Sequence, residues 1–293
     1  MYPEAEVSAG GQDSLTRDCH RSARTFPRET ALGGRADRQV MPVIRFDRVR
    51  TSFAGAIVLD DISFDVRSGE FICLLGPSGC GKSTTLRLMG DLLQADEGTI
   101  EVLGRPPSAS WHELSYVFQS PRLLPWRTAL DNVCLGMELR GTGGSKAQRQ
   151  ARAREHLDRA GLGADVEKYP GALSGGERQR VSIARALAVD PSIILMDEPF
   201  SALDVRTKRS LREEILGIWQ QTGKTIVFVT HDIDEALYLA DTVVIFSDKP
   251  TRIVRRVEIA EERPRRIDDK PALRTCRAEV RELFADVVPE EQM

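Results

Sequence analysis

Short apolar runs separated by glycine-rich or polar stretches are the main pattern of the chain after residue 40. Strand-like patterns cover residues 43–49, 57–66 and 71–75, and the last of these leads directly into Gly76. Beyond this glycine the apolar spacing becomes helical, over residues 84–89. A strand, a glycine-rich loop and a helix in this order are typical of a phosphate-binding unit.

Four further apolar runs are predicted as buried strands, at residues 115–118, 193–196, 226–230 and 242–246. Helical patterns such as residues 206–221 separate them. Strands that alternate with helices are typical of α/β proteins, in which the central strands are mostly parallel. We therefore predict an α/β fold with a mostly parallel sheet.

The stretch of about 120–175 interrupts this alternation. It has no strong strand pattern, and two helices are predicted at residues 130–139 and 147–160, with a loop containing Gly141, Gly143 and Gly144 between them. We interpret the stretch as a helical insertion in the α/β body.

Both ends of the chain are predicted to lie outside the main domain, which we place at residues 41–250. Residues 1–40 carry six arginines and six acidic residues without an apolar core, so they fit neither a secretory signal nor a transit peptide and are predicted as a disordered tail. Met41 directly precedes the first strand pattern and is a candidate translation start. Residues 251–293, with an edge-strand pattern at 253–259 and one amphipathic helix, are predicted as a short C-terminal extension.

Composition excludes several classes of protein. With 41 basic and 44 acidic residues the net charge is −3, which does not favour binding to nucleic acid or to an acidic membrane surface. The longest apolar runs are far shorter than the roughly 20 residues that span a bilayer. The five cysteines show neither metal-ligand spacing nor a dense disulfide pattern, which favours reduced thiols in a cytosolic compartment.

The first motif that carries chemistry is the phosphate loop, G-x-x-x-x-G-K-[ST]. Its backbone N–H groups and the following helix N-terminus can hold phosphate oxygens. Lys82 is predicted to reach the β- and γ-phosphates, and Ser83 to bind magnesium. The predicted nucleotide-binding residues of this motif are Gly76, Pro77, Ser78, Gly79, Cys80, Gly81, Lys82, Ser83 and Thr84.

The second motif is a pair of carboxylates, Asp197 and Glu198, at the end of the apolar run 193–196. Asp197 is predicted to hold magnesium and Glu198 to polarise an attacking water. Such a strand end is common in α/β proteins and has a purely structural alternative. Its position 115 residues after Lys82 (197 − 82), in a chain with a phosphate loop, indicates nucleotide hydrolysis.

Two single residues are weaker candidates. Gln119 follows the predicted strand 115–118 and is placed to reach the metal or the water. His231 follows the strand 226–230 and is placed to contact the γ-phosphate or to hold the water. The structural alternatives are a surface glutamine and a histidine that is simply hydrogen-bonded.

The octapeptide of residues 173–180, Leu-Ser-Gly-Gly-Glu-Arg-Gln-Arg, lies between these motifs. Ser174 and Glu177 form a capping-box sequence that would begin any helix. A helix N-terminus with a serine hydroxyl, Gly175 and Gly176 also provides a second wall around a γ-phosphate. We therefore add Ser174, Gly175, Gly176 and Glu177 to the predicted nucleotide-binding residues.

These motifs, in this order, resemble the nucleotide-binding subunit of an ABC transporter over residues 43–250. The resemblance implies a P-loop NTPase (RecA-like) core with a mostly parallel sheet, an antiparallel β subdomain and a helical subdomain insertion. It also implies an ATPase with ATP and Mg²⁺ as cofactors. In the family the octapeptide of one copy closes over ATP held by another, so a second copy of the chain is an implied partner.

Two more residues gain roles only from this resemblance. Phe53 stands where the family usually stacks an aromatic ring on adenine, although a core phenylalanine is the structural alternative. Asp204, in the sequence Ser201-Ala202-Leu203-Asp204, would communicate between the two shared sites.

A finer resemblance lies in residues 118–126 and 230–241, which look like the ATPase subunits of importers for nitrate, sulfonate, taurine or bicarbonate-type anions. It implies integral membrane permease subunits as partners, a solute-binding protein as an indirect partner, and a peripheral position on the cytoplasmic face of the inner membrane. In the family the helical insertion receives a coupling helix of the permease. The structural alternative is that Leu123, Leu124 and Trp126 pack the core of the insertion.

Other classes share the octapeptide. DNA-repair and chromosome-structure ATPases place long coiled coils or zinc modules between their two halves, which the 115-residue spacing and the lack of cysteine pairs disfavour. Soluble translation factors typically carry two cassettes, whereas one set of motifs is present here. An exporter subunit or a division-linked cassette is disfavoured by residues 121–126. Specificity for the transported anion would reside in the other subunits.

Overall fold

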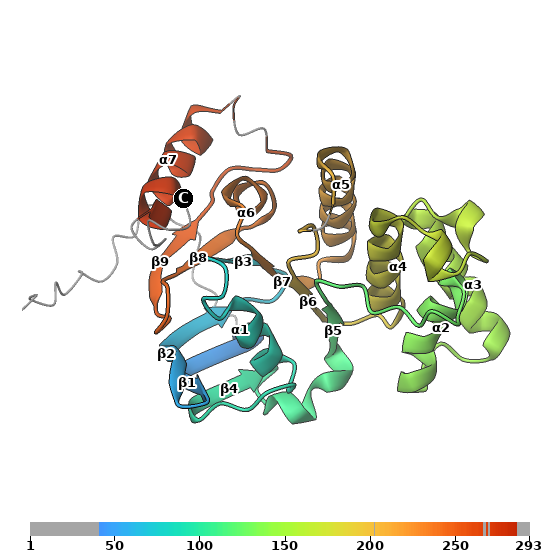
Figure 1. Cartoon of the computed structure of the whole chain (residues 1–293), viewed down its shortest axis with the longest axis horizontal. Helices are drawn as coiled ribbons and strands as arrows, with labels where there is room; N and C mark the ends of the chain where they lie inside the picture. Colours follow the sequence, from blue (N-terminus) through green and yellow to red (C-terminus); the bar gives the residue numbers. More distant parts are fainter. Residues whose placement is uncertain (1–40, 202, 266–267, 269, 286–293) are drawn as a thin grey trace, which may run out of the picture. The chain divides into compact units, whose positions relative to one another are not determined.

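The computed structural model describes residues 41–201, 203–265, 268 and 270–285. Its centre is a six-stranded sheet with the strand order β5-β6-β7-β3-β8-β9 (Figure 1). The first five of these strands are parallel, and β9 adds to the edge in the antiparallel direction. Their bounds are β3 Phe71–Leu75, β5 Leu114–Val117, β6 Ile193–Asp197, β7 Thr225–Thr230, β8 Thr242–Phe246 and β9 Ile253–Glu258. The predicted mostly parallel α/β sheet is confirmed.

A second sheet is antiparallel, with the order β2-β1-β4. It consists of β1 Ile44–Phe53, β2 Ala56–Val66 and β4 Glu97–Val102. The strand pattern predicted β1 and β2 but not β4, whose side chains are mostly exposed and polar. Strand β4 requires a glycine at position 98, because φ is +83° there and a Cβ atom would lie 2.4 Å from the carbonyl oxygen of Arg48. The antiparallel β subdomain implied by the resemblance is thus present.

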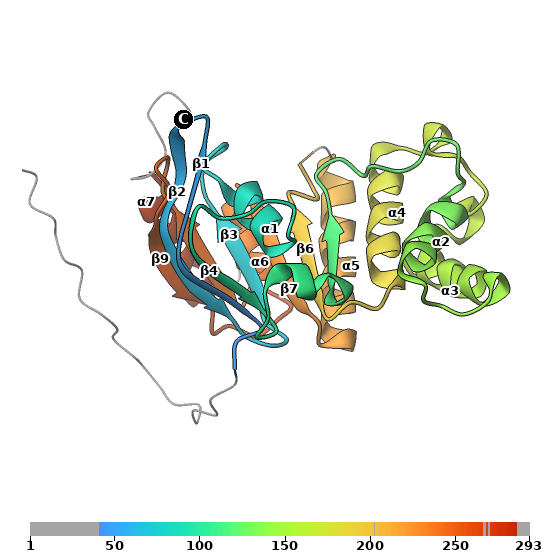
Figure 2. The ribbon, with the colours of Figure 1, turned by 90° about the horizontal axis from the view of Figure 1, so that it is seen from below.

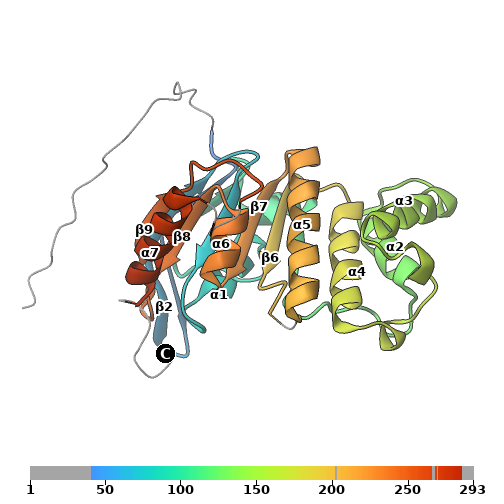
Figure 3. The same ribbon diagram turned by 90° about the horizontal axis from the view of Figure 1, so that it is seen from above.

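The two faces of the six-stranded sheet have separate cores, as the alternation of side chains along β3 requires. Ile72 and Leu74 pack with α1 Lys82–Met89 and the antiparallel sheet. Phe71, Cys73 and Leu75 pack on the other face. That face is covered by α5 Val205–Thr222, α6 Ile233–Leu239 and α7 Pro271–Ala285 (Figures 2 and 3).

The helical subdomain has a third core of its own. It is formed by α2 Ala129–Arg140, α3 Lys146–Arg159 and one face of α4 Gly175–Ala188 (Figure 3). The opposite face of α4, through Ile183 and Leu187, belongs to the core of the sheet. Helix α4 is therefore the structural link between the helical subdomain and the sheet.

The segment predicted as a C-terminal extension packs onto the sheet. Strand β9 pairs with β8, and Leu273 and Val280 of α7 are buried in the same core as α6. The Arg265 guanidinium is buried and donates to backbone carbonyl groups of residues 237, 240 and 259. The predicted tail of residues 1–40 lies outside the described residues.

Candidate functional site: the phosphate loop and the strand ends

The site residues lie at the carboxyl edge of the parallel sheet, because neighbouring strands end at the same level. Leu75 of β3 is paired with Thr230 of β7, and Asp197 of β6 is paired with Val229 of β7. The phosphate loop, Glu198 and His231 therefore follow directly from adjacent strands. In open α/β sheets this edge is the usual place of a ligand.

The phosphate loop leads into α1 without a side-chain cap. The N-cap residue, Gly81, has φ +111°, which favours glycine, and a Cβ atom there would lie 2.9 Å from the Leu59 side chain. Lys82 is 4% exposed, and its Nζ donates to the carbonyl oxygens of Gly76 at 2.8 Å and Pro77 at 2.7 Å. The loop thus holds its own lysine in its centre.

The side chains of the loop differ in what they can contact. Gly76 and Pro77 are buried, whereas Ser78 and Gly79 are exposed. Cys80 is fully buried in the core beneath the loop, and burial raises the pKa of its thiol. Only its backbone is therefore available to a ligand.

The predicted magnesium ligands Ser83 and Asp197 meet directly. Ser83 Oγ donates to Asp197 Oδ1 at 2.7 Å, and the Tyr116 hydroxyl donates to Asp197 Oδ2 at 3.3 Å. Burial raises the pKa of Asp197, and no lysine or arginine of the described residues forms an ion pair with it. A buried carboxylate beside a hydroxyl group, with no cationic partner of its own, fits Mg²⁺, which prefers oxygen ligands.

Glu198 lies at the centre of a cluster with His231, Lys82 and Gln119. Its carboxylate lies 3.3 Å from His231 Nδ1 and 3.9 Å from Lys82 Nζ, and it accepts from Gln119 Nε2 at 3.4 Å. The hydrogen bond with His231 lowers the pKa of Glu198 and raises the pKa of His231. Glu198 has φ +40°, an uncommon value for a residue with a side chain, which is often found at functional sites.

A pocket of about 170 Å³ lies beside this cluster. Its lining includes the side chains of Phe53 and Thr84 together with Lys82 and Glu198. Phe53 is 44% exposed, so it is not a core phenylalanine. Two further lining residues, Val58 and Lys249, were missed by sequence reasoning because neither belongs to a motif; the loop after β8 brings Lys249 to the pocket.

The octapeptide residues do not line this pocket. Ser174 is the N-cap of α4; its Oγ accepts from the Glu177 backbone N–H at 3.2 Å, and the Glu177 carboxylate accepts from the Ser174 N–H at 2.7 Å. The predicted capping box is therefore formed. A Cβ atom added at Gly175 would have no neighbouring atom within 4 Å. A Cβ atom added at Gly176 would lie 2.6 Å from the side chain of Thr207 in α5.

Asp204 is also a helix cap. Its Oδ1 accepts from the backbone N–H groups of Arg206 at 3.1 Å and Thr207 at 3.0 Å, at the start of α5. The close approach of Gly176 to Thr207 places the starts of α4 and α5 side by side. One chain thus presents two separate groups of predicted site residues.

Comparison with known proteins agrees with this geometry. A family model described as "ABC transporter" matches residues 59–201. The taurine import ATP-binding protein TauB of Pseudomonas aeruginosa (strain UCBPP-PA14) is 42% identical over 241 residues, which cover 80% of this chain and 91% of TauB. The bicarbonate transport ATP-binding protein CmpD of a Synechocystis strain is 44% identical over 193 residues, which cover 66% of this chain and 68% of CmpD.

A solved structure shares the fold. It is the dimeric structure of a post-hydrolysis state of an ATP-binding cassette bound to ADP and Pi. It has 31% sequence identity and a TM-score of 0.67, and the match covers 75% of this chain and 100% of that chain.

The parallel sheet, the phosphate loop and the carboxylates at the strand ends define a P-loop nucleotide-hydrolysing protein. The similar proteins show to which family of nucleotide-hydrolysing proteins the chain belongs. The chain belongs to the ABC transporter family and is an ATP-binding ATPase of that family. The resemblance inferred from the motif order is confirmed.

Proposed function

We propose that this chain is the ATP-hydrolysing subunit of an importer that takes up a small anion, such as nitrate, a sulfonate or taurine, through separate permease subunits. The names of TauB and CmpD, which are taurine and bicarbonate transport proteins, support the importer class and the kind of substrate. The observation that carries the ATPase role is the Glu198 carboxylate, held between Lys82, His231 and Gln119 beside the phosphate loop.

Each residue of the cluster has a chemical role in this proposal. Lys82 exchanges its two loop carbonyl groups for the β- and γ-phosphate oxygens of ATP. Glu198 has a lowered pKa and is ionised at neutral pH, so it accepts a hydrogen bond from the attacking water and orients it. His231 keeps this carboxylate in place and contacts the γ-phosphate. Phe53 provides an exposed ring for stacking on the adenine.

Magnesium fits the remaining oxygen ligands. Ser83, Asp197 and Gln119 would hold the ion, which supplies positive charge against the phosphate oxygens when it is bound. The chain itself contributes the buried Asp197 carboxylate, which Ser83 and Tyr116 already orient by hydrogen bonds.

The role of Glu198 is tested by Glu198→Gln. The amide keeps the size of the side chain but cannot act as a carboxylate base, so we expect ATP turnover to fall by about 100-fold or more. ATP binding, measured by equilibrium dialysis, should be retained because Lys82 and the loop are unchanged. Substantial remaining turnover in the variant would contradict this role.

We further propose that two copies of the chain share two ATP sites. Ser174, Gly175, Gly176 and Glu177 lie outside the pocket of their own phosphate loop, so they are available to ATP held by the other copy. The similar solved cassette is dimeric and bound to ADP and Pi, which supports this arrangement. Asp204 caps α5 at Thr207, which Gly176 approaches closely, and this proximity supports a role for Asp204 in communication between the two sites.

The docking site for the permease is proposed at a groove between the sheet and the helical subdomain. Its lining includes the exposed side chains of Leu92, Trp111 and Leu139, of which Leu139 is 76% exposed. Exposed apolar residues in one groove are typical of a protein interaction site. An amphipathic cytoplasmic helix of the permease is the expected occupant, because such grooves take the apolar face of a helix.

Trp126 is a further exposed apolar side chain that is available to a partner. It is 71% exposed, so the alternative that it packs the core of the insertion is wrong for this residue. Leu123, in contrast, packs partly against that core.

The permease proposal is tested by Leu139→Asp in the full chain, purified from membranes of the native host. We expect co-purification of integral membrane subunits to fall severalfold. Soluble ATPase activity should stay within twofold, because Leu139 does not line the phosphate-loop pocket. Val254→Asp, at another exposed apolar residue, is the control. Failure to recover any membrane partner with the unaltered chain would favour a soluble role.

Attachment through the permease would place the chain at the cytoplasmic face of the inner membrane, as a peripheral subunit. No helix in the described part of the chain is long and apolar enough to cross a bilayer. A solute-binding protein would deliver the anion to the permease and would not contact this chain.

A further inference from the structure

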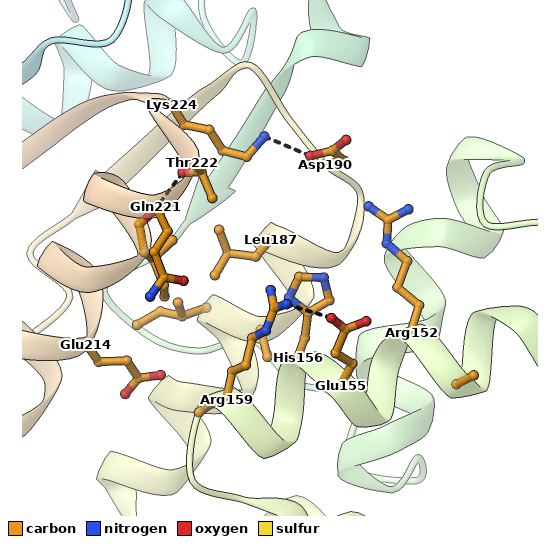
Figure 4. Close-up of a pocket in the computed structure, with 15 residues that line it drawn as sticks. Arg152, Glu155, His156, Arg159, Leu187, Asp190, Glu214, Gln221, Thr222 and Lys224 are labelled. Carbon is orange, nitrogen blue, oxygen red and sulfur yellow. Dashed lines mark hydrogen bonds and ion pairs between the residues drawn. The ribbon is translucent and has the colours of Figure 1, made fainter.

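A second cavity lies between α3 of the helical subdomain and α5 (Figure 4). Its volume is about 460 Å³, within the range of pockets that hold small organic molecules. Helix α3 supplies one wall through Arg152, His156 and Arg159, and α5 supplies the opposite wall through Glu214 and Ile218. No residue of the phosphate loop or of the strand ends lines it.

The floor of this cavity is apolar. It is formed by Ile183, Ala184 and Leu187 of α4, all of which are buried in the cores of the protein, and Ile218 and Ala151 continue the apolar surface onto both walls. An occupant with an apolar body would remove this surface from water, which stabilises binding by roughly 25 cal/mol per Å².

The rim is charged, and most of its charges are already paired. Arg159 Nη2 donates to the Glu155 carboxylate at 2.6 Å, and Lys224 Nζ donates to Asp190 at 2.8 Å (Figure 4). Arg152 forms no ion pair with an acidic side chain among the described residues, so its guanidinium is the rim cation without an acidic partner of its own. Such a guanidinium favours a carboxylate or a sulfonate, which it can bind through two hydrogen bonds.

The other titratable groups of the cavity do not oppose an anion. Burial, together with Arg152 and Arg159, lowers the pKa of His156, so the imidazole is neutral at physiological pH. Burial raises the pKa of Glu214 to about 7, although Arg180 lies 4.0 Å away, so this carboxyl is partly protonated at neutral pH. The remaining lining carboxylates, Glu155 and Asp190, are paired with Arg159 and Lys224, and Asp190 is also attracted by Arg152. The cavity therefore has one cation without an ion pair and little uncompensated negative charge.

We propose that the cavity between α3 and α5 is a binding site for a small organic anion with an apolar, ring-sized body, whose carboxylate or sulfonate group contacts Arg152 and whose body rests on Leu187 and Ile218. Helix α3 belongs to the helical subdomain and α5 to the sheet, and α4 links them. A bound anion would therefore bridge the helical subdomain and the sheet.

The experiment uses the full chain and 2-naphthoate as the probe, with 2-naphthylmethanol as its uncharged counterpart. Isothermal titration calorimetry should show saturable binding of one naphthoate per chain, about tenfold tighter than the binding of the alcohol, because the carboxylate accepts charge-assisted hydrogen bonds from Arg152 and the alcohol does not. Arg152→Gln should weaken naphthoate binding about tenfold and leave binding of the alcohol unchanged.

Two further variants make the test specific to this cavity. Ala151→Trp places a large side chain in the cavity from an exposed position of α3 and should abolish binding of both compounds. Arg154→Gln removes an arginine of the same helix that does not line the cavity and should change the affinity less than twofold. Absence of naphthoate binding, or equal binding to Ala151→Trp and the unaltered chain, overturns the proposal.

Discussion

The starts of helices α1 and α4 differ in how their free backbone N–H groups are satisfied. Helix α4 has a complete capping box from its own Ser174 and Glu177. Helix α1 begins after Gly81, and no side chain caps it. The first turn of a helix leaves N–H groups without partners inside the helix, and an anion can satisfy them. The comparison indicates that α1 is completed by its ligand, whereas α4 is preformed before any ligand arrives.

The side chains of Lys82, at the start of α1, and Ser174, at the start of α4, also differ in the hydrogen bonds that they already form. The Lys82 ammonium is buried and already bonded to two carbonyl groups of its own loop. The Ser174 hydroxyl accepts from the Glu177 N–H, and the Ser174 N–H and hydroxyl together lower the pKa of the Glu177 carboxylate. Lys82 therefore has to exchange hydrogen bonds with its own loop to bind phosphate, whereas the hydrogen bonds of Ser174 hold the start of its own helix.

The largest expected effect is on ATPase activity, when the start of α1 is altered in one chain and the start of α4 in the other. Lys82→Met and Ser174→Asp should each lower ATPase activity by at least about 100-fold, because the first removes the cation and the second places a carboxylate opposite the γ-phosphate. Mixing the two variants should restore part of the activity. In a mixed dimer one site combines Lys82 of one chain with Ser174 of the other, and this site is intact. A mixture as inactive as the separate variants would contradict the shared site.

A smaller effect separates capping from ligand binding at α4. Ser174→Ala removes the cap and should lower the free energy of unfolding by about 1 kcal/mol. Ser174→Asp provides a carboxylate that caps equally well, so its stability in urea should equal that of the unaltered chain although its ATPase activity is lost. Glu177→Gln keeps the capping box and is the control. Equal loss of stability in both serine variants would show that the cap does not act as described.

The smallest expected effect concerns pH and the His231–Glu198 pair at the α1 side. The folded-state pKa of His231 is raised, so its stabilising contribution is complete below its ordinary pKa of about 6.5 and is lost as pH rises through the raised value. Glu198 has a lowered pKa, so its contribution is present above about 4.5 and is lost as pH falls through the lowered value. The stabilising contributions of His231 and Glu198 are therefore both present at pH values between the ordinary pKa of Glu198 and that of His231.

His231→Gln should therefore be less stable than the unaltered chain mainly in this acidic window. Half of the His231 side chain is exposed, so solvent screening keeps the difference below about 1 kcal/mol. Urea unfolding at several pH values measures it, and the two proteins should become equally stable above the raised pKa of His231. A stability difference that is independent of pH would contradict the ion pair.

Much of the fold follows from local sequence. The buried strands β3, β6, β7 and β8 have continuous apolar runs, and glycine, serine and carboxylate residues mark the loop and the helix caps. Strand β4 escaped prediction because an exposed edge strand has no apolar run. The seven-residue helix α6 is too short for a clear helical period.

Contacts between distant segments could not be predicted. The hydrogen bond from Tyr116 to Asp197, the pocket lined by both Lys249 and Phe53, and the cavity between α3 and α5 each join residues from separate elements. None of them has a local signal in the chain.

The order of motifs along the chain determined the family, the ATPase chemistry and the residue types that carry it, because phosphate loops and helix caps depend on neighbouring residues. Only the tertiary structure decided which of these residues meet. The parallel register of β3, β7 and β6 brings Lys82, Glu198 and His231 into one cluster, whereas α4 places Ser174 outside the pocket of its own chain. These parallel strands are far apart in the sequence and are joined by long crossover connections, so no local stretch of sequence shows which of them pair.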